Sequence, residues 1–268
     1  MINRILFILF FACAILSCKE EVSNDFAPTR TFKLAPPQFV VDSLLFKESA
    51  RIEVDFDLAD AQIRYTDDGK EVTENSNLYQ HPLSTDTSAL YTFRAFHPDY
   101  QKSDAVYVKL IQIKNDISGT AVTVAPDPHS NYLGKGSNGL TDLQKGTIQF
   151  RKGKEWSGFQ TKEIKINLNF EKAILISKLT VSTLRDHGSW IFSPRSIIVL
   201  TNGKKLGELM LAPPKNGQST QTEFLEIPII KGKYKTVDVQ IHSLKKIPEW
   251  HQGKGTVPFF FMDEILIE

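Results

Sequence analysis

Residues 250–268 read Trp-His-Gln-Gly-Lys-Gly-Thr-Val-Pro-Phe-Phe-Phe-Met-Asp-Glu-Ile-Leu-Ile-Glu. The second half of this stretch, from residue 259, is an apolar run that ends in alternation, which is typical of a buried strand. The first half holds a tryptophan, a histidine and two glycines, residue types that can approach a ligand closely. The stretch therefore predicts a strand that closes a β-sandwich beneath a loop suited to binding, and it gives little sign of catalysis.

Short strand patterns fill the rest of the chain. Residues 51–58 alternate between polar and apolar side chains, and residues 62–65 repeat the alternation before a turn at Asp67-Asp68-Gly69. The pair Asn202-Gly203 is a strong hairpin signal. From residue 139 onward we expect strands at residues 146–150, 163–169, 175–184, 196–200, 205–211, 223–230, 236–242 and 259–267. No segment after residue 17 keeps an apolar helical face for three turns, so we expect an all-β protein of two sandwiches.

The chain begins with the pattern of a secretory signal peptide, residues 1–17. Arg4 precedes an apolar run too short to span a bilayer comfortably. The run ends Ala14-Ile15-Leu16-Ser17-Cys18, which resembles a bacterial lipobox and implies that Cys18 becomes the lipidated first residue. Apart from Cys18, the chain's other cysteine is Cys13, inside the signal, so the mature chain has no pair for a disulfide. An uncleaved anchor helix or a signal for secretion without an anchor are the alternatives.

Residues 18–35 lack any apolar period and read as a tether. Lys19, Glu20 and Glu21 resemble the tag with which Bacteroidetes export lipoproteins to the cell surface; a solvated charged tether is the alternative. The expected location is the outer membrane, lipid-anchored, at the cell surface. The net charge is +1, and removal of Arg4 with the signal brings it to zero. A net charge of zero gives no indication of nucleic-acid binding, so the expected partner is neutral.

Residues 36–115 carry a first resemblance. The segments Ala61-Gln62-Ile63-Arg64-Tyr65-Thr66-Asp67-Asp68-Gly69 and Thr92-Phe93-Arg94-Ala95-Phe96 resemble the immunoglobulin-like domain at the C-terminus of chitobiases and β-hexosaminidases. The resemblance implies a spacer without chemistry of its own. Residues 115–137 are rich in glycine, proline, aspartate and asparagine, which indicates a boundary.

Residues 116–268 carry a second resemblance. In order, Gly139-Leu140-Thr141-Asp142, Trp156-Ser157-Gly158-Phe159, Trp190-Ile191-Phe192-Ser193-Pro194, Trp250-His251 and Asp263-Glu264-Ile265 resemble the discoidin, or coagulation-factor type C, domain. Its fold is a galactose-binding-like jelly roll. The likeness is closest to the version attached to Bacteroidetes β-N-acetylhexosaminidases.

A structural calcium ion is implied by this second resemblance. Calcium takes six to eight oxygen ligands, and Asp142, Thr147 and Glu264 match the family's ligand positions. Leu143 departs from the pattern, because the family usually has a glycine there. In the alternative, Asp142 caps a turn and Glu264 is a solvated charge at a strand end.

Aromatic and polar residues of two loops are the candidate ligand-binding residues. Sugars lay their C–H faces on aromatic rings, while their hydroxyls need donors and acceptors. The candidates are Arg185, His187, Trp190, Trp250 and His251. Trp156 is favoured as core; for Trp190 and Trp250 core and ligand contact stay equally open, and each histidine more often serves a loop hydrogen bond.

Catalysis has little support. Asp263 and Glu264 are adjacent on an expected strand, so their side chains point to opposite faces and cannot flank one glycosidic bond. The chain lacks the common hydrolase and nucleotide-binding motifs. We therefore expect a surface-anchored, non-catalytic lipoprotein that binds a glycan or hexosamine-containing saccharide. The alternative is a protein-docking or scaffold module derived from a hexosaminidase tail, working with surface glycosidase or transporter proteins.

Overall fold

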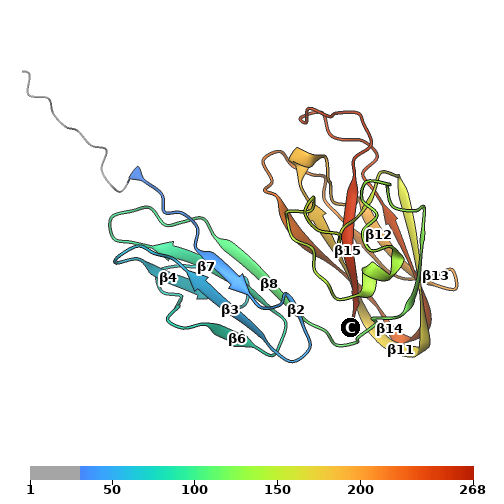
Figure 1. The fold of residues 1–268 in the computed structure, drawn as a ribbon, viewed down its shortest axis with the longest axis horizontal. Helices are drawn as coiled ribbons and strands as arrows, with labels where there is room; N and C mark the ends of the chain where they lie inside the picture. The colour runs from blue at the N-terminus through green and yellow to red at the C-terminus, as the bar shows by residue number, and fades with distance from the viewer. Residues whose placement is uncertain (1–30) are drawn as a thin grey trace, which may run out of the picture.

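The structure, a computed structural model, describes residues 31–268. The expected signal peptide, the lipidation site Cys18 and the tag at residues 19–21 lie outside this range. Figure 1 shows two bodies built of strands, the first in blue and green, the second running to the C-terminus in red. Within the described range, no helix combines the length and apolar character needed to cross a membrane.

The first body, residues 33–113, is a sandwich of two sheets. One sheet has the order β1-β3-β6 and the other β2-β8-β7-β4-β5. Alternating side chains such as those of Ile52, Phe93 and Leu110 fill the space between them. Leu34 belongs to the same core and its N–H bonds to Gln101, so packing begins just before the expected boundary at residue 36. The strands are β1 (Gln38–Val41), β2 (Leu45–Phe46), β3 (Ala50–Asp55), β4 (Gln62–Thr66), β5 (Asn77–Leu78), β6 (Leu83–Thr85), β7 (Ala89–Phe96) and β8 (Val106–Gln112).

The second body is built around two long strands that pair with each other almost throughout, β11 (Glu163–Arg185) and β14 (Gln221–His242). The first part of β11 also pairs with β9, and its last part pairs with β15. Strand β12 pairs with the last part of β14. Since the two long strands are shared in this way, they connect both layers of a second sandwich. Its other strands are β9 (Ala121–Ala125), β10 (Ser157–Phe159), β12 (Ser196–Thr201), β13 (Lys204–Met210) and β15 (Phe260–Ile267).

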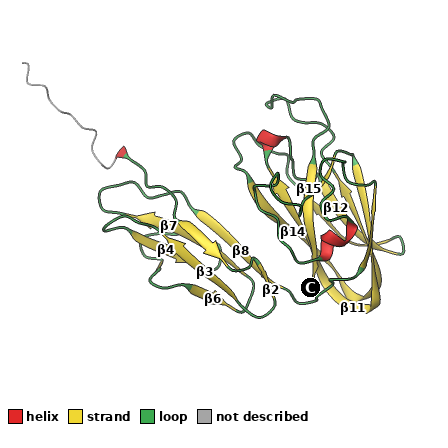
Figure 2. Cartoon of the chain, in the orientation of Figure 1, coloured by secondary structure: helices red, strands yellow, loops and turns green. Residues whose placement is uncertain are grey.

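The closing strand is confirmed. Every residue of β15 is buried, and the strand lies between β10 and β11, where Figure 1 shows it in red. The hairpin at Asn202 and Gly203 is also confirmed: both residues have positive φ, 48° and 75°, as a type I′ turn requires. The helical elements of the second body are short 3-10 turns, η3 (Ser137–Thr141) and η4 (His187–Ser189), and Figure 2 shows them as two small red segments among yellow strands. The all-β expectation is therefore confirmed.

Several strand assignments differ from expectation, among them the short strand β10, which lies outside the expected strands. Residues 146–150 form a loop, because the Gly146 N–H bonds to the Asp263 carboxylate at 2.6 Å instead of to a neighbouring strand. Strand β9 lies inside residues 115–137, which were expected to be a boundary between domains. Its sequence Ala-Val-Thr-Val-Ala alternates in the way that is typical of a strand. Each long strand replaces two expected shorter ones, since β-bulges at the midpoint let β11 continue where a turn was expected.

The two sandwiches contact each other through a small apolar cluster and ion pairs. Leu45 and Ile111 of the first sandwich pack against Leu266 of β15. Beside them the Lys109 ammonium lies 2.6 Å from the Glu226 carboxylate, which also lies 3.5 Å from the ammonium of Lys178. The contact holds the start of β14 next to β8.

Candidate functional site

The five residues expected to bind a ligand all lie at one end of the second sandwich. Arg185 ends β11, η4 follows it directly, and the loop between β14 and β15 carries Trp250 and His251. Ring centroids of His187 and Trp250 are 5.3 Å apart, and those of Trp190 and His251 are 6.1 Å apart. We call Arg185, His187, Trp190, Phe192, Trp250 and His251 the loop cluster.

Both histidines of the loop cluster make contacts inside the protein. The Nδ1 atom of His251 accepts the Gly253 N–H at 3.0 Å, so Nε2 carries the proton and donates to the His187 carbonyl at 2.8 Å. His187 is buried and stacks on Phe192 with centroids 4.3 Å apart. Burial and the nearby Arg185 charge lower the pKa of His187, which keeps the ring neutral. The histidines position the tryptophans and are not free to meet a ligand.

Arg185 is likewise engaged. Its guanidinium lies 2.9 Å from the Glu223 carboxylate, with 11% and 14% of the two side chains exposed. Ser193 donates a second hydrogen bond to Glu223 at 2.6 Å. This pair ties the end of β11 to the start of β14 and gives the loop cluster a fixed base.

Trp190 and Trp250 are half-buried residues, so part of each remains open to solvent. Trp190 has φ 63° and ψ 24°, a left-handed conformation that is costly for a bulky residue. Its N–H bonds to the His187 carbonyl, and Ile191 pairs with Asp186 on either side of the turn. Gly253 lies against one face of the Trp190 ring, where an added Cβ would come within 2.9 Å of ring carbons. The ring is therefore held in place, with Gly253 covering part of one face.

Phe192 is a member of the loop cluster that the sequence did not single out. It stacks on His187 and lies 6.2 Å from Trp250 and 5.6 Å from His251, centroid to centroid. The residue is fully buried and provides the apolar floor of the cluster. The aromatic residue two positions after Trp190 was the only local signal.

Of the three expected calcium ligands, two lie together. The carboxylates of Asp142 and Glu264 accept hydrogen bonds from the same N–H, that of Gln144, at 3.0 and 2.8 Å. Burial, and next the hydrogen bond with Asp142, raise the pKa of Glu264 to about 10. The Glu264 Oε2 atom is buried and has no hydrogen-bond partner. Asp142 is already paired with the Lys135 ammonium at 2.9 Å, so Glu264 is the member of the pair that needs a proton or a further cation.

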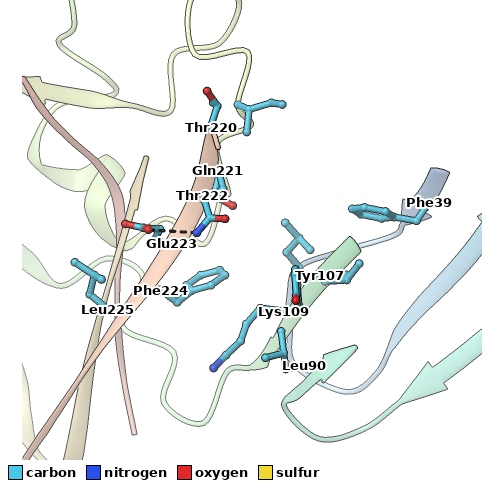
Figure 3. Close-up of a pocket in the computed structure, with 13 residues that line it drawn as sticks. Phe39, Leu90, Tyr107, Lys109, Thr220, Gln221, Thr222, Glu223, Phe224 and Leu225 are labelled. Atoms are coloured by element: carbon cyan, nitrogen blue, oxygen red, sulfur yellow. Dashed lines mark hydrogen bonds between the residues drawn. The ribbon is translucent and has the colours of Figure 1, made fainter. Parts of the chain in front are cut away.

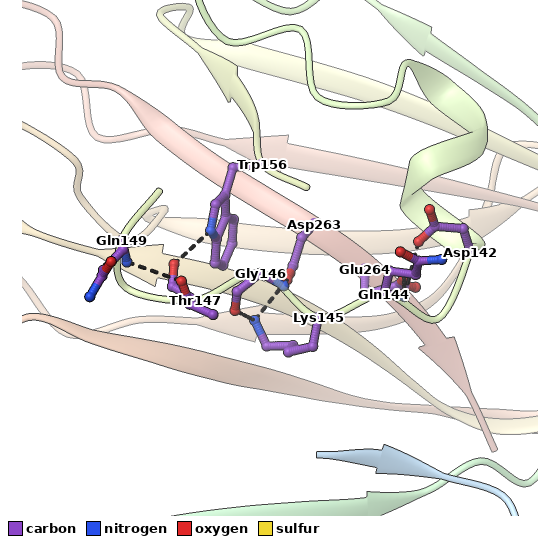
Figure 4. A network of polar contacts seen from close by, with 9 residues as sticks. All are labelled: Asp142, Gln144, Lys145, Gly146, Thr147, Gln149, Trp156, Asp263 and Glu264. Carbon is purple, nitrogen blue, oxygen red and sulfur yellow. Dashed lines mark hydrogen bonds and ion pairs between the residues drawn. The ribbon is translucent and has the colours of Figure 1, made fainter. Parts of the chain in front are cut away.

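Thr147 lies apart from that pair. Its hydroxyl accepts the Gln149 N–H at 3.2 Å, and its carbonyl accepts the indole N–H of Trp156 at 2.9 Å. Figure 4 shows Thr147 on the other side of Lys145 from Asp142 and Glu264. Within residues 31–268, no group of three or more His, Cys, Asp or Glu side chains is arranged to hold a metal ion. The expected set of three ligands is thus present only as its two carboxylates.

The turn after Asp142 keeps the conformation that a glycine would favour. Leu143 has φ 61°, and its side chain packs with Leu45 and Leu266 between the two sandwiches. The departure from glycine at this position therefore adds a contact at the domain interface without changing the turn.

Asp263 points away from Glu264, as expected for neighbours on a strand. Its carboxylate lies 2.7 Å from the Lys145 ammonium, with 0% and 7% of the two side chains exposed. The ammonium also lies 4.4 Å above the ring of Trp156, which is buried as core. Burial lowers the pKa of Lys145 and raises the pKa of Asp263. This ion pair fastens the loop after η3 to the closing strand.

Comparison with known proteins gives a family match for the first sandwich. Residues 45–108 match the model of the chitobiase/β-hexosaminidase C-terminal domain. No curated protein sequence matches the chain.

Among solved structures, the chain is similar to the lectin binding domain of Lectinolysin complexed with Lewis b, at 11% identity, TM-score 0.38, and coverage of 57% of this chain and 95% of that one. It is similar to CpGH89CBM32-5 from Clostridium perfringens, in complex with GalNAc-β-1,3-galactose, at 12% identity, TM-score 0.37, and coverage of 57% and 96%. A SusE-like protein matches over 86% of this chain and 95% of its own, at 13% identity and TM-score 0.37. Similarities at these identities and TM-scores do not show what this chain binds.

Proposed function

We propose that the protein is a non-catalytic carbohydrate-binding protein whose loop cluster holds a neutral, hexosamine-containing glycan. One observation carries the proposal: Trp190 and Trp250 are partly open to solvent, yet histidine rings, Phe192 and Gly253 hold them in place. Rings fixed before binding lose little conformational freedom when a sugar face stacks on them. The chemistry suits the C–H faces of sugars.

The hydrogen bonds to sugar hydroxyls come from other residues than the sequence indicated. The Arg185 guanidinium is paired with Glu223, the His251 ring bonds to the His187 carbonyl, and the buried His187 ring stacks on Phe192. The exposed side chains of Gln252 and Lys254 follow Trp250 directly in the same loop. Amide and ammonium groups donate to hydroxyl oxygens, so these two side chains provide the polar contacts beside the rings.

The absence of a reaction is part of the proposal. Asp263 and Glu264 are both fully buried and bond to different parts of the loop that follows η3. A glycosidase needs two carboxyl groups on either side of an accessible glycosidic bond. This pair is neither accessible nor on one face, which supports a binding role.

A calcium ion in this protein remains a proposal, held by Asp142 and Glu264. The buried Oε2 atom of Glu264, which has no partner, fits a bound cation. Calcium would displace the Lys135 ammonium, which lies 2.9 Å from Asp142, and would join the loop after η3 to β15 through both carboxylates. Calcium should then raise the melting temperature at pH 8 in the wild-type chain and leave Glu264→Gln unchanged. Equal melting temperatures with calcium and with EDTA in the wild type would exclude the ion.

Attachment to the outer membrane through Cys18, with exposure at the cell surface, is also a proposal. It is supported by the sequence pattern ahead of Cys18. Metabolic labelling with a palmitate analogue tests it: the wild type should incorporate the label and Cys18→Ala should not. Protease treatment of intact cells then reports the side of the membrane.

The proposed function is tested by affinity gel electrophoresis of the full chain in gels that contain glycol chitin, galactan or xylan. At least one polysaccharide should retard the wild type, and Trp190→Ala or Trp250→Ala should weaken that retardation about tenfold or more. Met210→Ala, an exposed residue of β13 outside the loop cluster, is the control. Free migration of the wild type in every gel, or unchanged retardation of both tryptophan variants, would rule the proposal out.

A further inference from the structure

A groove of about 650 Å³ runs between the two sandwiches, away from the loop cluster's rings. Its first wall comes from the first sandwich and includes Phe39 of β1 and Tyr107 of β8. Its second wall is the start of β14, with Thr220 just before it and Gln221 and Phe224 within it. Figure 3 shows these side chains on the two sides of the opening. A groove of this size is within the usual range for binding sites of small molecules.

The first wall exposes two aromatic rings that the fold does not need. Tyr107 is 61% exposed and Phe39 is 40% exposed. Both rings face the polar side chains of Thr220 and Gln221 across the groove. The Thr220 hydroxyl and the Gln221 amide each donate one bond within the protein, to Asp186 and to Glu223, and their oxygen atoms can still accept from a sugar hydroxyl. Aromatic rings opposite these acceptors match the C–H face and the hydroxyl edge of a sugar.

The charged groups of the groove are already neutralised. Lys109 is paired with Glu226 at 2.6 Å, and Glu223 is paired with Arg185 at 2.9 Å. The groove therefore offers no unpaired charge among its described lining residues, which favours a neutral ligand over an ionic one. The first of these pairs joins the two sandwiches and so fixes the distance between the walls.

The second wall of the groove is bonded to the elements that carry the loop cluster. The Thr220 hydroxyl donates to the Asp186 carboxylate at 3.1 Å, and Asp186 caps η4, which is followed directly by Trp190. Glu223, another lining residue, forms the ion pair with Arg185 of the cluster. These two contacts connect the second wall of the groove to the loops that carry the tryptophans.

We propose that this groove is a second saccharide subsite, joined through the start of β14 to the elements that carry the loop cluster, so that the protein binds an extended neutral glycan chain across both sandwiches. The inference rests on the proposed function and adds the length of the ligand to it. Sugar units stack on Tyr107 and Phe39 at one end of the chain and on Trp190 and Trp250 at the other. The first sandwich is then part of the binding surface and more than a spacer.

The competing occupant is an extended peptide. Residues 221–228 of β14 pair with β11 on one side, and no described strand pairs with their other edge. An open strand edge can accept a peptide strand. However, Pro228 has no backbone N–H with which to bond a peptide strand. The Lys109 side chain also lies beside this edge, in its ion pair with Glu226. These observations favour the sugar.

Isothermal titration calorimetry of the full chain with chitobiose and chitohexaose tests the subsite. The wild type should bind chitohexaose at least about tenfold more tightly than chitobiose, and the double variant Phe39→Ala/Tyr107→Ala should lose that gain while chitobiose affinity stays unchanged. Tyr107→Phe keeps the ring and should keep the gain. Phe32→Ala, an aromatic residue just before the same sandwich with 56% exposure that does not line the groove, is the matched control. Circular dichroism verifies folding, which these exposed positions leave intact.

The outcomes separate the two proposals. If Trp190→Ala weakens both sugars and the double variant binds chitohexaose like the wild type, the groove is not a subsite but the loop cluster still binds sugar. If neither sugar binds the wild type, both proposals fail for this class of glycan. A peptide from a random library that binds the wild type and not the double variant, together with equal affinities for the two sugars, assigns the groove to a peptide and overturns the inference.

Discussion

At the scale of single residues, the closing strand keeps two buried acids apart by giving each a different partner. Asp263 is neutralised by the Lys145 ammonium at 2.7 Å. Glu264 has no cation among the described side chains that bond to it, and its raised pKa of about 10 means that it holds a proton at neutral pH. The same strand therefore carries one member of an ion pair next to a neutral acid. Each of the two acids leads to a prediction about the stability of the folded protein.

Glu264 should make the folded protein less stable as pH rises. Its ordinary pKa is 4.5 and its pKa in the folded chain is about 10, so between these values the folded state binds more protons than the unfolded state. Stability is then full below pH 4.5 and is lost progressively toward pH 10. Glu264→Gln, which mimics the protonated acid, should flatten this decline of stability in EDTA-containing buffer. At pH 8.5 its melting temperature should exceed that of the wild type, by about 2–4 °C for each kcal/mol of stability regained.

Thermal unfolding followed by circular dichroism from pH 5 to 9 measures this. Glu171→Gln, an exposed acid at the midpoint of β11, is the control and should follow the wild type. Parallel profiles of wild type and Glu264→Gln would show that Glu264 is ionised in the folded chain.

The Lys145–Asp263 pair should be costly to break from one side. Lys145→Met leaves the fully buried Asp263 carboxylate without its cation, which typically costs about 3–5 kcal/mol. Adding Asp263→Asn removes the stranded charge and keeps an acceptor for the Gly146 N–H, so the double variant should be more stable than Lys145→Met alone. Urea unfolding gives both free energies; equal stability of the single and double variants would contradict an ionised pair.

At the scale of elements, η4 and the loop between β14 and β15 form one unit that presents the tryptophans. His251 joins the two through its bond to the His187 carbonyl, and Gly253 packs on the Trp190 ring. Because the contact at Gly253 leaves no room for a Cβ, this glycine sets where the indole lies. The orientation of the ring is thus a property of two elements far apart in the chain.

Gly253→Ala should displace Trp190. The added methyl would lie 2.9 Å from the ring carbons Cε2 and Cζ2, so the half-buried ring has to move outward. We expect a red-shifted tryptophan emission, a loss of polysaccharide retardation comparable to Trp190→Ala, and little change in melting temperature. Gly188→Ala is the matched control in η4, since its Cβ would meet only the Asp186 carboxylate, at 3.4 Å. Retained binding in Gly253→Ala would show that the ring position does not matter.

At the scale of the whole molecule, the two sandwiches act together only if their contact is maintained. Leu45, Ile111 and Leu266 form a small apolar contact, and Glu226 adds its pairs with Lys109 and Lys178. Burial raises the pKa of Glu226, but the two ammonium groups outweigh it and the net pKa is lowered, so the carboxylate stays charged at neutral pH. Half-exposed ion pairs of this kind contribute little energy, so they orient the domains more than they stabilise them.

Lys109→Glu should weaken the contact between the two sandwiches. It replaces an ion pair with a separation of 2.6 Å by two carboxylates that repel each other. Small-angle X-ray scattering should then show a larger radius of gyration, and the gain in affinity for chitohexaose over chitobiose should shrink. Lys109→Met removes the attraction without adding repulsion and should change the scattering much less. An unchanged radius of gyration in Lys109→Glu would mean that the apolar contact alone sets the arrangement.

Local sequence patterns predict those strands and turns whose conformation depends on residues adjacent in the chain. The apolar run of β15 and the pair Asn202-Gly203 define a strand and a turn by themselves, and both were recognised. The missing pieces depend on residues distant in sequence. The family resemblance groups Thr147 with Asp142 and Glu264, but Lys145, which reaches Asp263, lies between Thr147 and these two carboxylates. The role of Phe192 becomes visible only once η4 packs against the loop between β14 and β15. The groove beside Tyr107 becomes visible only once β14 is placed against β8.

The central claim is that two of the three tryptophans meet a glycan, and the indole N–H signals in a ¹H–¹⁵N NMR spectrum test it most directly. The chain has three tryptophans, and the N–H of the buried Trp156 is bonded to the Thr147 carbonyl. Titration with chitohexaose and with lacto-N-tetraose should move the signals of Trp190 and Trp250 and leave that of Trp156 in place, with assignments from Trp→Phe variants. If neither sugar moves the Trp190 and Trp250 signals, the loop cluster is not a glycan-binding site.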